Sequence, residues 1–398
     1  MKVRRINLQE QKYGYDISLL FVTIFLCVFG LIMIYSASYY TAEVRGYGAS
    51  YYLNRQIQWT GIGLVALIGL SFVPYRLYKS WMILAAYGAS LILMILTSYT
   101  SLGHTAGGRT RWITLLGMTF QTAEIVKIGL ILMLSWLVMR FARAYRGWRL
   151  WLMMLVTAIV PFFLVLSNDL SSAVIILSIP LVMIVILNRN RRLSIFMLVV
   201  FLILLAFLIY VKNMDAETLQ KIGKNLAEKT PIHEYQMRRF YIWNDPTYSS
   251  GDTDGQQVLQ GLYAIGSGGL FGKGLGASTQ KLGFVPEASN DMIFAILCEE
   301  LGLFGAFSLI ILYIFLLYRM LRIATQAEDA FGALFTIGVM TQIAVQVFFH
   351  IAVVTNLLPN TGISLPFISY GGTSSLFLMA EIGIVISIGR GRRERQKS

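Results

Sequence analysis

The sequence has few charged residues and almost no cysteine or histidine. Only 13% of its 398 residues are charged, about half the roughly 25% of a soluble globular domain, whereas 56% are hydrophobic. A soluble fold of this length needs far more polar surface, so the composition excludes an ordinary cytosolic enzyme, a disordered chain and a fibrous protein. Two cysteines exclude a disulfide scaffold and a cysteine-rich metal site, and three histidines without HExxH spacing argue against a zinc hydrolase.

What the sequence does have is long apolar runs. A transmembrane helix needs about 20 mostly apolar residues. Runs of about that length predict ten spans, near 17–38, 57–74, 80–98, 121–139, 150–166, 170–187, 193–211, 292–318, 330–355 and 366–388. The fifth and sixth are short and lie close together, so they could also form a broken or re-entrant pair. We predict an all-α polytopic membrane protein with one domain over residues 1–398 and a large extracellular loop, about 212–290, between helices 7 and 8.

The positive charges indicate how these spans are oriented. Most of the 33 lysines and arginines lie in the termini and loops of one side, whereas the short loops of the other side hold only Arg45, Arg55, Arg109 and Arg111. Cytoplasmic loops are enriched in these residues, so both termini are predicted to be cytoplasmic. The net charge of +13 is then a topology signal that favours contact with membrane lipids and not with nucleic acid.

Several polar segments gather at the outer ends of the predicted spans. Residues 99–120 are too polar to span, and they predict either an interfacial segment with snorkelling arginines or a cationic lip, with Arg109 and Arg111, for a lipid-linked anion. Glu124 and Lys127 follow at i and i+3 on one helix face. Ionisable groups within a membrane face a partner or a cavity, so this pair is either a structural ion pair or part of a site.

A glycine-rich stretch and an aspartate precede the eighth span. The run 266–276 is not a phosphate-binding loop of the Walker type, because Gly274 follows Lys273. It could still bind an anion through its backbone amides, or simply be a flexible re-entrant loop. Asp291 then stands at the mouth of the span, as a helix cap or as a functional carboxylate. Glu299 and Glu300 lie deeper with no local cation in the sequence, so they need buried partners or raised pKa values.

The last outer loop breaks a span. Two prolines and Gly371-Gly372 interrupt residues 357–376, and broken backbone at membrane depth is tolerated only where protein or a cavity covers it. These polar, broken elements converge on the outer half of the bundle. They favour a site for an amphiphilic anionic substrate over a channel, since no acidic ring or carbonyl filter is visible.

These stretches resemble the SEDS family (shape, elongation, division and sporulation), which includes FtsW, RodA and a sporulation relative. The resemblance covers essentially the whole chain. It is carried by the last-loop stretch 361–374, the glycine-rich run 266–276, the Pro286–Gly302 stretch, and Arg111-Trp112-Ile113 followed by Gln121 and Glu124. The 274–281 stretch and Gly371-Gly372-Thr373 look more FtsW-like or sporulation-like than RodA-like. His350 stands where the family usually has asparagine, and Thr122-Ala123 stand where it has Pro-Ser.

The resemblance implies a peptidoglycan glycosyltransferase of the bacterial cytoplasmic membrane. Such enzymes polymerise lipid II into glycan strands on the outer face, for septal or cell-wall synthesis, together with a class B penicillin-binding protein and with divisome or elongation proteins. The family's catalytic aspartate falls on Asp291. The substrate-binding residues implied by the matching stretches are Arg111, Glu124, Lys127, Lys273, Glu287, Arg109, Ser369, Gly371 and Gly372.

The chemistry of the reaction suggests a role for each group. A sugar 4-hydroxyl would displace the lipid diphosphate from an anomeric carbon with inversion, and undecaprenyl diphosphate would leave. This needs a base for the hydroxyl, assigned to Asp291, and cations for the diphosphate, assigned to Arg111 and Lys127 with Lys273 as a further candidate. Glu287 would position the acceptor sugar. A divalent cation, Mg²⁺ or Mn²⁺, could share the diphosphate charge, but the sequence shows no ligand cluster for one and no other cofactor.

Two other classes of function remain open from the sequence. Ten spans, broken elements and intramembrane charges also fit a lipid II flippase or transporter. Headgroup movement in liposomes without polymer would favour that reading. The third reading is a non-catalytic divisome scaffold, which growth of a polymerase-dead mutant would favour.

Overall fold

The computed structural model is a bundle of long helices. It describes residues 16–100, 102–106, 109–115, 118–142, 144, 147–166, 168–188, 191–215, 217–219, 221–222, 234–247 and 253–395. Its elements are α1 (Ile17–Val44), α2 (Tyr51–Phe72), the 3-10 helix η1 (Tyr75–Lys79), α3 (Met82–Tyr99), β1 (Gly103–Ala106), β2 (Arg109–Leu115), β3 (Met118–Gln121), α4 (Thr122–Phe141), α5 (Trp148–Leu166), α6 (Leu170–Leu187), α7 (Arg191–Lys212), α9 (Glu234–Asn244), α10 (Thr253–Gly268), α11 (Ile293–Gln326), α12 (Ala330–Val354) and α13 (Gly372–Arg395).

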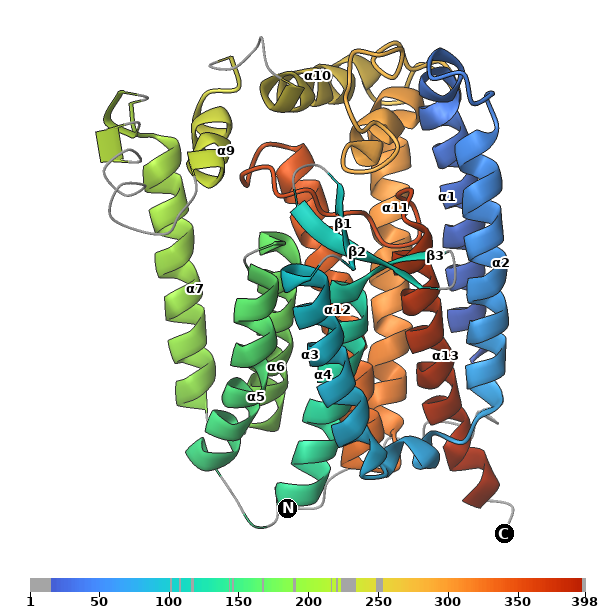
Figure 1. The fold of residues 1–398 in the computed structure, drawn as a ribbon, viewed down its shortest axis with the longest axis vertical. Coiled ribbons are helices and arrows are strands. Elements are labelled where there is room, and N and C mark those ends of the chain that lie inside the picture. The colour runs from blue at the N-terminus through green and yellow to red at the C-terminus, as the bar shows by residue number, and fades with distance from the viewer. Residues whose placement is uncertain are drawn as a thin grey trace, which may run out of the picture.

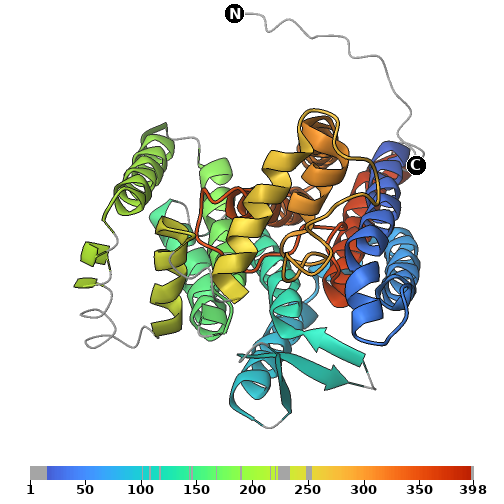
Figure 2. The ribbon, with the colours of Figure 1, turned by 90° about the horizontal axis from the view of Figure 1, so that it is seen from above.

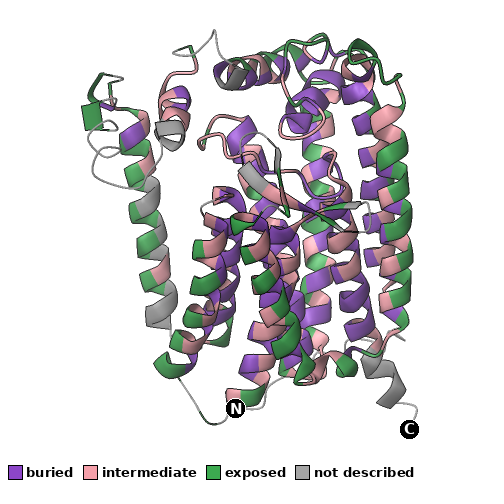
Figure 3. Cartoon of the chain, viewed as in Figure 1, coloured by how far each residue is buried: buried purple, intermediate pink, exposed green. Residues whose placement is uncertain are grey.

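The predicted spans are present as helices that run side by side (Figure 1). They correspond to α1 to α7 and α11 to α13. Eight of these, within the described residues, are long and apolar enough to cross a membrane, and α2 and α7, each of 22 residues, are the other two. Exposed apolar side chains such as Phe21, Val65 and Phe304 cover the outer faces, while buried residues fill the interior (Figure 3). The prediction of a helical membrane protein is confirmed.

The fifth and sixth predicted spans form two separate helices. α5 and α6 have 19 and 18 residues and pack against each other, so they are not a broken or re-entrant pair. α6 begins where Asp169 caps it, because the Asp169 carboxylate accepts a hydrogen bond from the backbone N–H of Ser172 at 3.2 Å. The cap also fixes where the Asp169 side chain lies.

The all-α prediction needs one correction, because part of the polar segment 99–120 forms a sheet. β1, β2 and β3 make an antiparallel sheet in that order, in which Trp112 pairs with Gln121 and Ile113 with Phe120. The alternation in Arg111-Trp112-Ile113-Thr114 is the period-2 pattern of a strand with two different faces. Ile113 is buried, which anchors one face to the helices. The sheet therefore places the side chain of Arg111 at the rim of the bundle.

The long segment predicted at 212–290 contains helices as well as loop. α9 and α10 lie in it, and α10 crosses the upper end of the bundle (Figures 1 and 2). The indole N–H of Trp243 on α9 donates to the backbone carbonyl of Asn356 at 3.2 Å, which ties α9 to the last loop. Residues 223–233 and 248–252 lie outside the described part of the chain.

One end of the bundle collects the irregular elements. α4, α6, α11 and α13 begin at the upper end in Figure 1, where α12 ends and where the sheet lies. α1 begins and α13 ends at the opposite, lower end. We call the first of these ends the upper end throughout.

Buried Glu299 on α11 holds the glycine-rich segment 269–282 from one side. Its carboxylate pairs with Lys273 Nζ at 2.6 Å and accepts hydrogen bonds from the hydroxyl of Ser278 and from both the backbone and the hydroxyl of Thr279, at 3.1 and 2.9 Å. Because it gathers several donors from one short segment, this carboxylate fixes the fold of that segment.

The neighbouring Glu300 anchors the same segment to α1. It pairs with Lys281 Nζ at 2.6 Å, and Ser36 Oγ donates to it at 2.6 Å. The Lys281 ammonium also lies 2.9 Å from Ser36 Oγ, and both charged side chains are fully buried. The prediction that the two glutamates need buried partners is confirmed. The prediction that no cation lies near them was wrong, since the glycine-rich segment supplies Lys273 and Lys281.

We predict that Lys281→Met strongly destabilises the fold, because it leaves Glu300 buried without its cation. Breaking a buried pair in this way costs about 3–5 kcal/mol of unfolding free energy. The measurement is the thermal unfolding midpoint of the purified protein in detergent. Lys273→Met is the matched control with a smaller expected effect, because Lys273 is a third exposed and Glu299 keeps its hydroxyl and amide donors. A midpoint for Lys281→Met equal to that of the wild type would contradict the anchor.

Candidate active site

A cavity of about 430 Å³ opens at the upper end of the bundle. Its walls come from β2, β3, α4, α6, α9, α10, α12 and α13, together with the segments that precede α11 and α13. Of the predicted site residues, it is lined by Arg111, Glu124, Lys127, Glu287, Asp291 and Gly371. Segments from opposite ends of the sequence therefore bring most of the predicted site to one place.

Asp291 lies in this cavity just before α11. A Cβ added to Gly362 would meet Asp291 Oδ2 at 3.1 Å, and Gly362 has a φ of +71°, so glycine leaves room for the carboxylate there. Among the described residues, the Asp291 carboxylate makes no hydrogen bond, and the N-cap position of α11 is Met292, which has no side-chain cap. The structure therefore does not show Asp291 as a helix cap.

The pKa of Asp291 is raised to about 6, chiefly because burial disfavours the charged form. Negative charge on Glu287 and, more weakly, on Asp169 raises it as well, while the positive charges of Arg111 and Arg239 lower it. A carboxyl group with this pKa is mostly ionised at neutral pH and is more basic than an ordinary aspartate. It can accept a proton from a substrate hydroxyl.

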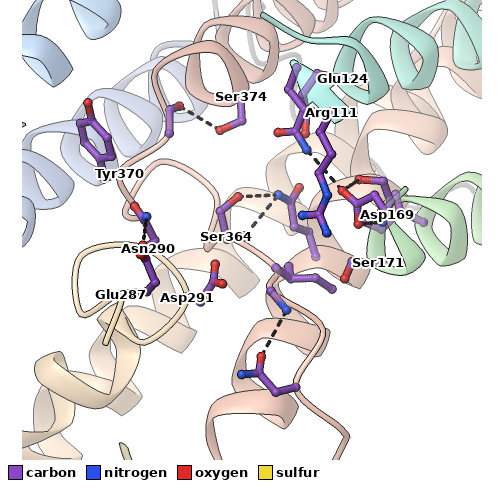
Figure 4. A pocket seen from close by; sticks show the side chains of 18 of the residues that line it. Arg111, Glu124, Asp169, Ser171, Glu287, Asn290, Asp291, Ser364, Tyr370 and Ser374 are labelled. Atoms are coloured by element: carbon purple, nitrogen blue, oxygen red, sulfur yellow. Dashed lines mark hydrogen bonds between the residues drawn. The ribbon is translucent and has the colours of Figure 1, made fainter. Parts of the chain in front are cut away.

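Arg111 reaches the cavity from β2. Its Nε donates to the backbone carbonyl of Asn168 at 2.8 Å, which fixes the guanidinium beside Asp169 at the start of α6. Figure 4 shows Arg111, Glu124 and Asp169 on one side of the cavity and Glu287, Asn290 and Tyr370 on the other, with Asp291 and Ser364 between them in this view. One side of the cavity thus holds Arg111 and Lys127 together with the carboxylates of Glu124 and Asp169, and the other holds the exposed carboxylate of Glu287. We call the first side the cationic side after Arg111 and Lys127.

Glu124 and Lys127 form the predicted ion pair deeper in the cavity. Lys127 Nζ lies 2.8 Å from Glu124 Oε1, and both side chains are almost fully buried. The second oxygen, Glu124 Oε2, has no hydrogen-bond partner among the residues that the structure describes. Below them, buried Glu381 on α13 is within electrostatic reach of Lys127 and receives a hydrogen bond from Gln342 at 3.2 Å. Lys127 is therefore a cation held in place by acidic neighbours.

Ser369 in the last loop holds the Asp291 segment and does not line the cavity. Its hydroxyl donates to the carbonyl of Asn290 at 2.8 Å and accepts from the backbone N–H of Leu365 at 2.7 Å. The next residue adds a backbone bond from Tyr370 N–H to the carbonyl of Ser289 at 2.9 Å. Ser369 was predicted to bind substrate, and the structure instead shows it joining the two loops that border the cavity.

The two glycines of the last loop differ in position. Gly371 lines the cavity and its N–H donates to Gln56 Oε1 at 3.3 Å. Gly372 starts α13 outside the cavity lining, where an added Cβ would lie 2.2 Å from Trp59, so only glycine fits against that indole. Gly372 is therefore a packing residue between α13 and α2.

Two other predicted binding residues are not placed in the cavity. Lys273 pairs with Glu299 and lies outside the lining. Arg109 begins β2, and its side chain lies outside the described part of the structure. The cations that do line the cavity, among the described residues, are Arg111, Lys127 and Arg239.

Sequence reasoning missed several residues of the site. Arg239 from α9, Asp169 from α6 and Asn290 line the cavity, and Asn290 Nδ2 donates to Glu287 Oε2 at 2.5 Å. Glu287 itself has a φ of +53°, an uncommon conformation for a residue with a side chain. The signal for Asp169 was present, since it is an ionisable residue between two apolar runs. Arg239 had no such signal, because it lies in a polar segment among other charges.

The site offers few ligands for a metal ion. Within the described residues, no group of three or more histidine, cysteine, aspartate or glutamate side chains is placed to hold one. Mg²⁺ is often bound by one or two carboxylates plus substrate phosphates, and this cavity has carboxylates at Glu124, Asp169, Glu287 and Asp291. The donor set fits a cation brought in with a phosphate group better than a resident metal.

The sequence matches a known protein family and curated proteins over nearly its whole length. The model of the FtsW, RodA and SpoVE family, described as cell cycle protein, matches residues 17–394. A probable peptidoglycan glycosyltransferase FtsW of Geobacter sp. strain M18 is 30% identical, over 94% of this chain and 96% of that protein. Stage V sporulation protein E of Bacillus subtilis is 32% identical, over 96% of this chain and 98% of its own.

Solved structures share the fold. A chain from a peptidoglycan synthase complex, studied for its coordination of polymerization and crosslinking, superposes with a TM-score of 0.73 and 26% identity, over 95% of this chain and 98% of that one. The rod shape determining protein RodA of Thermus thermophilus superposes with a TM-score of 0.64 and 23% identity, over 95% and 98% of the two chains. The arrangement of helices described above is thus a known one.

Proposed function

Because this chain belongs to the FtsW, RodA and SpoVE family of cell cycle proteins, we propose that it is a peptidoglycan glycosyltransferase that polymerises lipid II into glycan strands. Curated relatives that match nearly the whole chain carry the name of this enzyme. The observation that supports the chemistry best is Asp291, a carboxylate without a hydrogen-bond partner among the described residues, in a cavity with cations on one side.

Asp291 acts as the general base in this proposal. The 4-hydroxyl of one sugar attacks the anomeric carbon of another, the new glycosidic bond forms with inversion, and the hydroxyl proton passes to the Asp291 carboxylate. A base works best when its pKa lies near the working pH, and burial has moved Asp291 in that direction. The second carboxylate of a glycosidase is not needed, because a polyprenyl diphosphate leaves without protonation.

The cationic side of the cavity receives the leaving diphosphate. Arg111 and Lys127 bring two positive charges to it, and Arg239 from α9 also lines the cavity. Charge that develops on the leaving oxygens is stabilised by such fixed cations without reorganisation of solvent. Arg111 suits a phosphate group best, because its planar guanidinium can donate two parallel hydrogen bonds. Lys273 has no part in this arrangement, since Glu299 holds it.

Glu287 and Asn290 face the acceptor sugar. They lie across the cavity from Arg111 (Figure 4), and Asn290 orients the Glu287 carboxylate by a hydrogen bond. The backbone of Glu287 is held in a left-handed conformation, a kind of strain that clusters at functional sites. A divalent cation, Mg²⁺ or Mn²⁺, would neutralise part of the diphosphate charge if it enters bound to substrate.

The protein is an integral membrane protein, and the proposal places both termini in the cytoplasm. The excess of lysine and arginine on one side supports that orientation. Because α1 begins and α13 ends at the lower end, the cavity then faces the outer side of the cytoplasmic membrane. There it would meet lipid II, whose lipid chain stays among the membrane lipids.

The proposed partner is a class B penicillin-binding protein that crosslinks the strands. The similar chain in a complex for polymerization and crosslinking supports such a division of labour. Divisome or elongation proteins would direct the pair to the septum or the cylindrical wall.

We predict that Asp291→Asn strongly slows strand formation, since the amide cannot take the hydroxyl proton. General-base catalysis contributes about 10²–10⁴-fold to a reaction rate, so the polymerisation rate should fall by a factor of about 10² or more. The assay is polymerisation of lipid II by the purified protein with its penicillin-binding partner, using a partner that has no transglycosylase activity. Asp215→Asn is the matched control, because Asp215 caps a turn outside the cavity. Normal strands from Asp291→Asn would end the assignment, and headgroup movement without strands from any variant would favour a transporter.

We also predict that Arg111→Ala raises the donor KM. Loss of a charge-assisted contact to the diphosphate costs about 1.5–3 kcal/mol of binding free energy. This lowers the apparent affinity roughly tenfold or more. Arg111→Lys should recover only part of this, since the ammonium lacks the fork of the guanidinium. The measurement is steady-state kinetics with varied lipid II, and Arg76→Ala, which removes an ion pair outside the cavity, is the control. An unchanged KM and rate in Arg111→Ala would remove Arg111 from the donor site.

A further inference from the structure

A chain of four tyrosine rings leads out of the cavity. Tyr370 lines the cavity and meets Tyr52 edge to face at 5.2 Å between ring centroids. Tyr52 in turn meets Tyr51 edge to face at 5.2 Å, and Tyr51 stacks on Tyr47 at 4.6 Å with 23° between the planes. We call Tyr370, Tyr52, Tyr51 and Tyr47 the tyrosine ladder. It runs from the Glu287 side of the cavity over the start of α2 to the turn between α1 and α2.

Two arginines lie along the ladder. Arg45 donates from Nη1 to the hydroxyl of Tyr52 at 2.8 Å. The Arg55 guanidinium lies 5.4 Å from the centre of the Tyr51 ring and is within electrostatic reach of Tyr370. Both arginines are exposed, so each keeps donors that face solvent. The ladder is therefore a series of contacting aromatic rings with cations beside it.

The composition of this surface does not suit contact with lipid tails. Between Arg45 and Arg55 the aliphatic side chains are only Ala49 and Leu53. The neighbouring outer faces of the helices, by contrast, expose large apolar residues such as Ile57 and Val65. Tyr47 is 57% exposed, and it stands at the outer end of a ring series whose inner end borders the site. An interfacial aromatic belt would not need to reach into a cavity.

We propose that the tyrosine ladder binds the growing glycan strand, at the sugars that have already left the reacting position. This rests on the proposed function. Sugar rings present apolar C–H faces that pack on aromatic rings, and tyrosine offers a large, rigid, amphipathic surface at little loss of side-chain entropy. The carboxylates of the peptides that such a strand carries would meet Arg45 and Arg55.

A ladder of similar rings also suits a strand that must move. Stacking platforms tolerate any unit with a flat or apolar face, so a polymer can shift by one repeat and find equivalent contacts. Holding the strand near the cavity keeps its reacting end at a high effective concentration, which favours another addition over release. The ladder is therefore a determinant of strand length and has no role in the bond-forming step.

The experiment compares strand length with the rate of the first coupling. Tyr47→Ala and Tyr51→Ala are assayed with lipid II and the penicillin-binding partner, and products are separated by length. We expect strands shorter by about threefold or more, in line with the loss of a stacking contact, while the first coupling keeps its rate. Tyr51→Phe keeps the ring and should keep the length. Tyr99→Ala is the control, because Tyr99 is 71% exposed on α3 outside the ladder.

The outcomes separate this inference from the proposed function. Wild-type strand lengths from both alanine variants would overturn the ladder and leave the glycosyltransferase intact. A slower first coupling with unchanged length would also overturn it, since the rings would then act in the site itself. No strands from the wild type would defeat the proposed function and the ladder with it. If Tyr51→Ala does not fold, exposed Tyr47 still carries the test.

Discussion

The structure depends on the requirement that a charge buried in a helix bundle has a partner. Glu300 with Lys281, Glu299 with Lys273 and Glu124 with Lys127 all meet it, at 2.6 to 2.8 Å. The first two pairs fix the glycine-rich segment and with it the approach to α11, and the third fixes a cation in the cavity. Asp291 departs from this rule, as a carboxylate with no hydrogen-bond or ion-pair partner among the described residues, and its pKa is raised to about 6. The cost of burying a charge thus favours the ion pairs that stabilise the bundle, and it also makes the Asp291 carboxylate more basic.

The site combines segments that are far apart in the sequence. The sheet brings Arg111, α4 brings Lys127, and the loop before α11 brings Glu287 and Asp291. Ser369 joins that loop to the last one, and Gly362 leaves space for the Asp291 carboxylate. The cavity separates a cationic side for a diphosphate from a side suited to an acceptor hydroxyl. The tyrosine ladder continues that second side outward.

The sequence predicted the helices well, because apolar runs of span length have few alternatives. It also predicted Arg111, Glu124, Lys127, Glu287 and Asp291 in one site, through their resemblance to known motifs. The sequence analysis failed where the position of a residue depends on which distant residue it pairs with in the folded protein. The sheet was missed because its alternation is short and mixed with glycines, and Lys273 was assigned to a phosphate because its partner Glu299 follows 26 residues later. Arg239 and Tyr370 reach the cavity only through the packing of α9 and of the last loop.

The most direct test of the account is the pH dependence of kcat/KM for the coupling of lipid II. If Asp291 is the base, the rate should fall about tenfold per pH unit below an apparent pKa near 6 and level off above it, because the protonated carboxyl cannot accept the hydroxyl proton. The residual activity of Asp291→Asn should lack this acidic limb. A wild-type rate that is flat between about pH 5 and 7, or the same limb in the Asp291→Asn variant, would contradict the assignment.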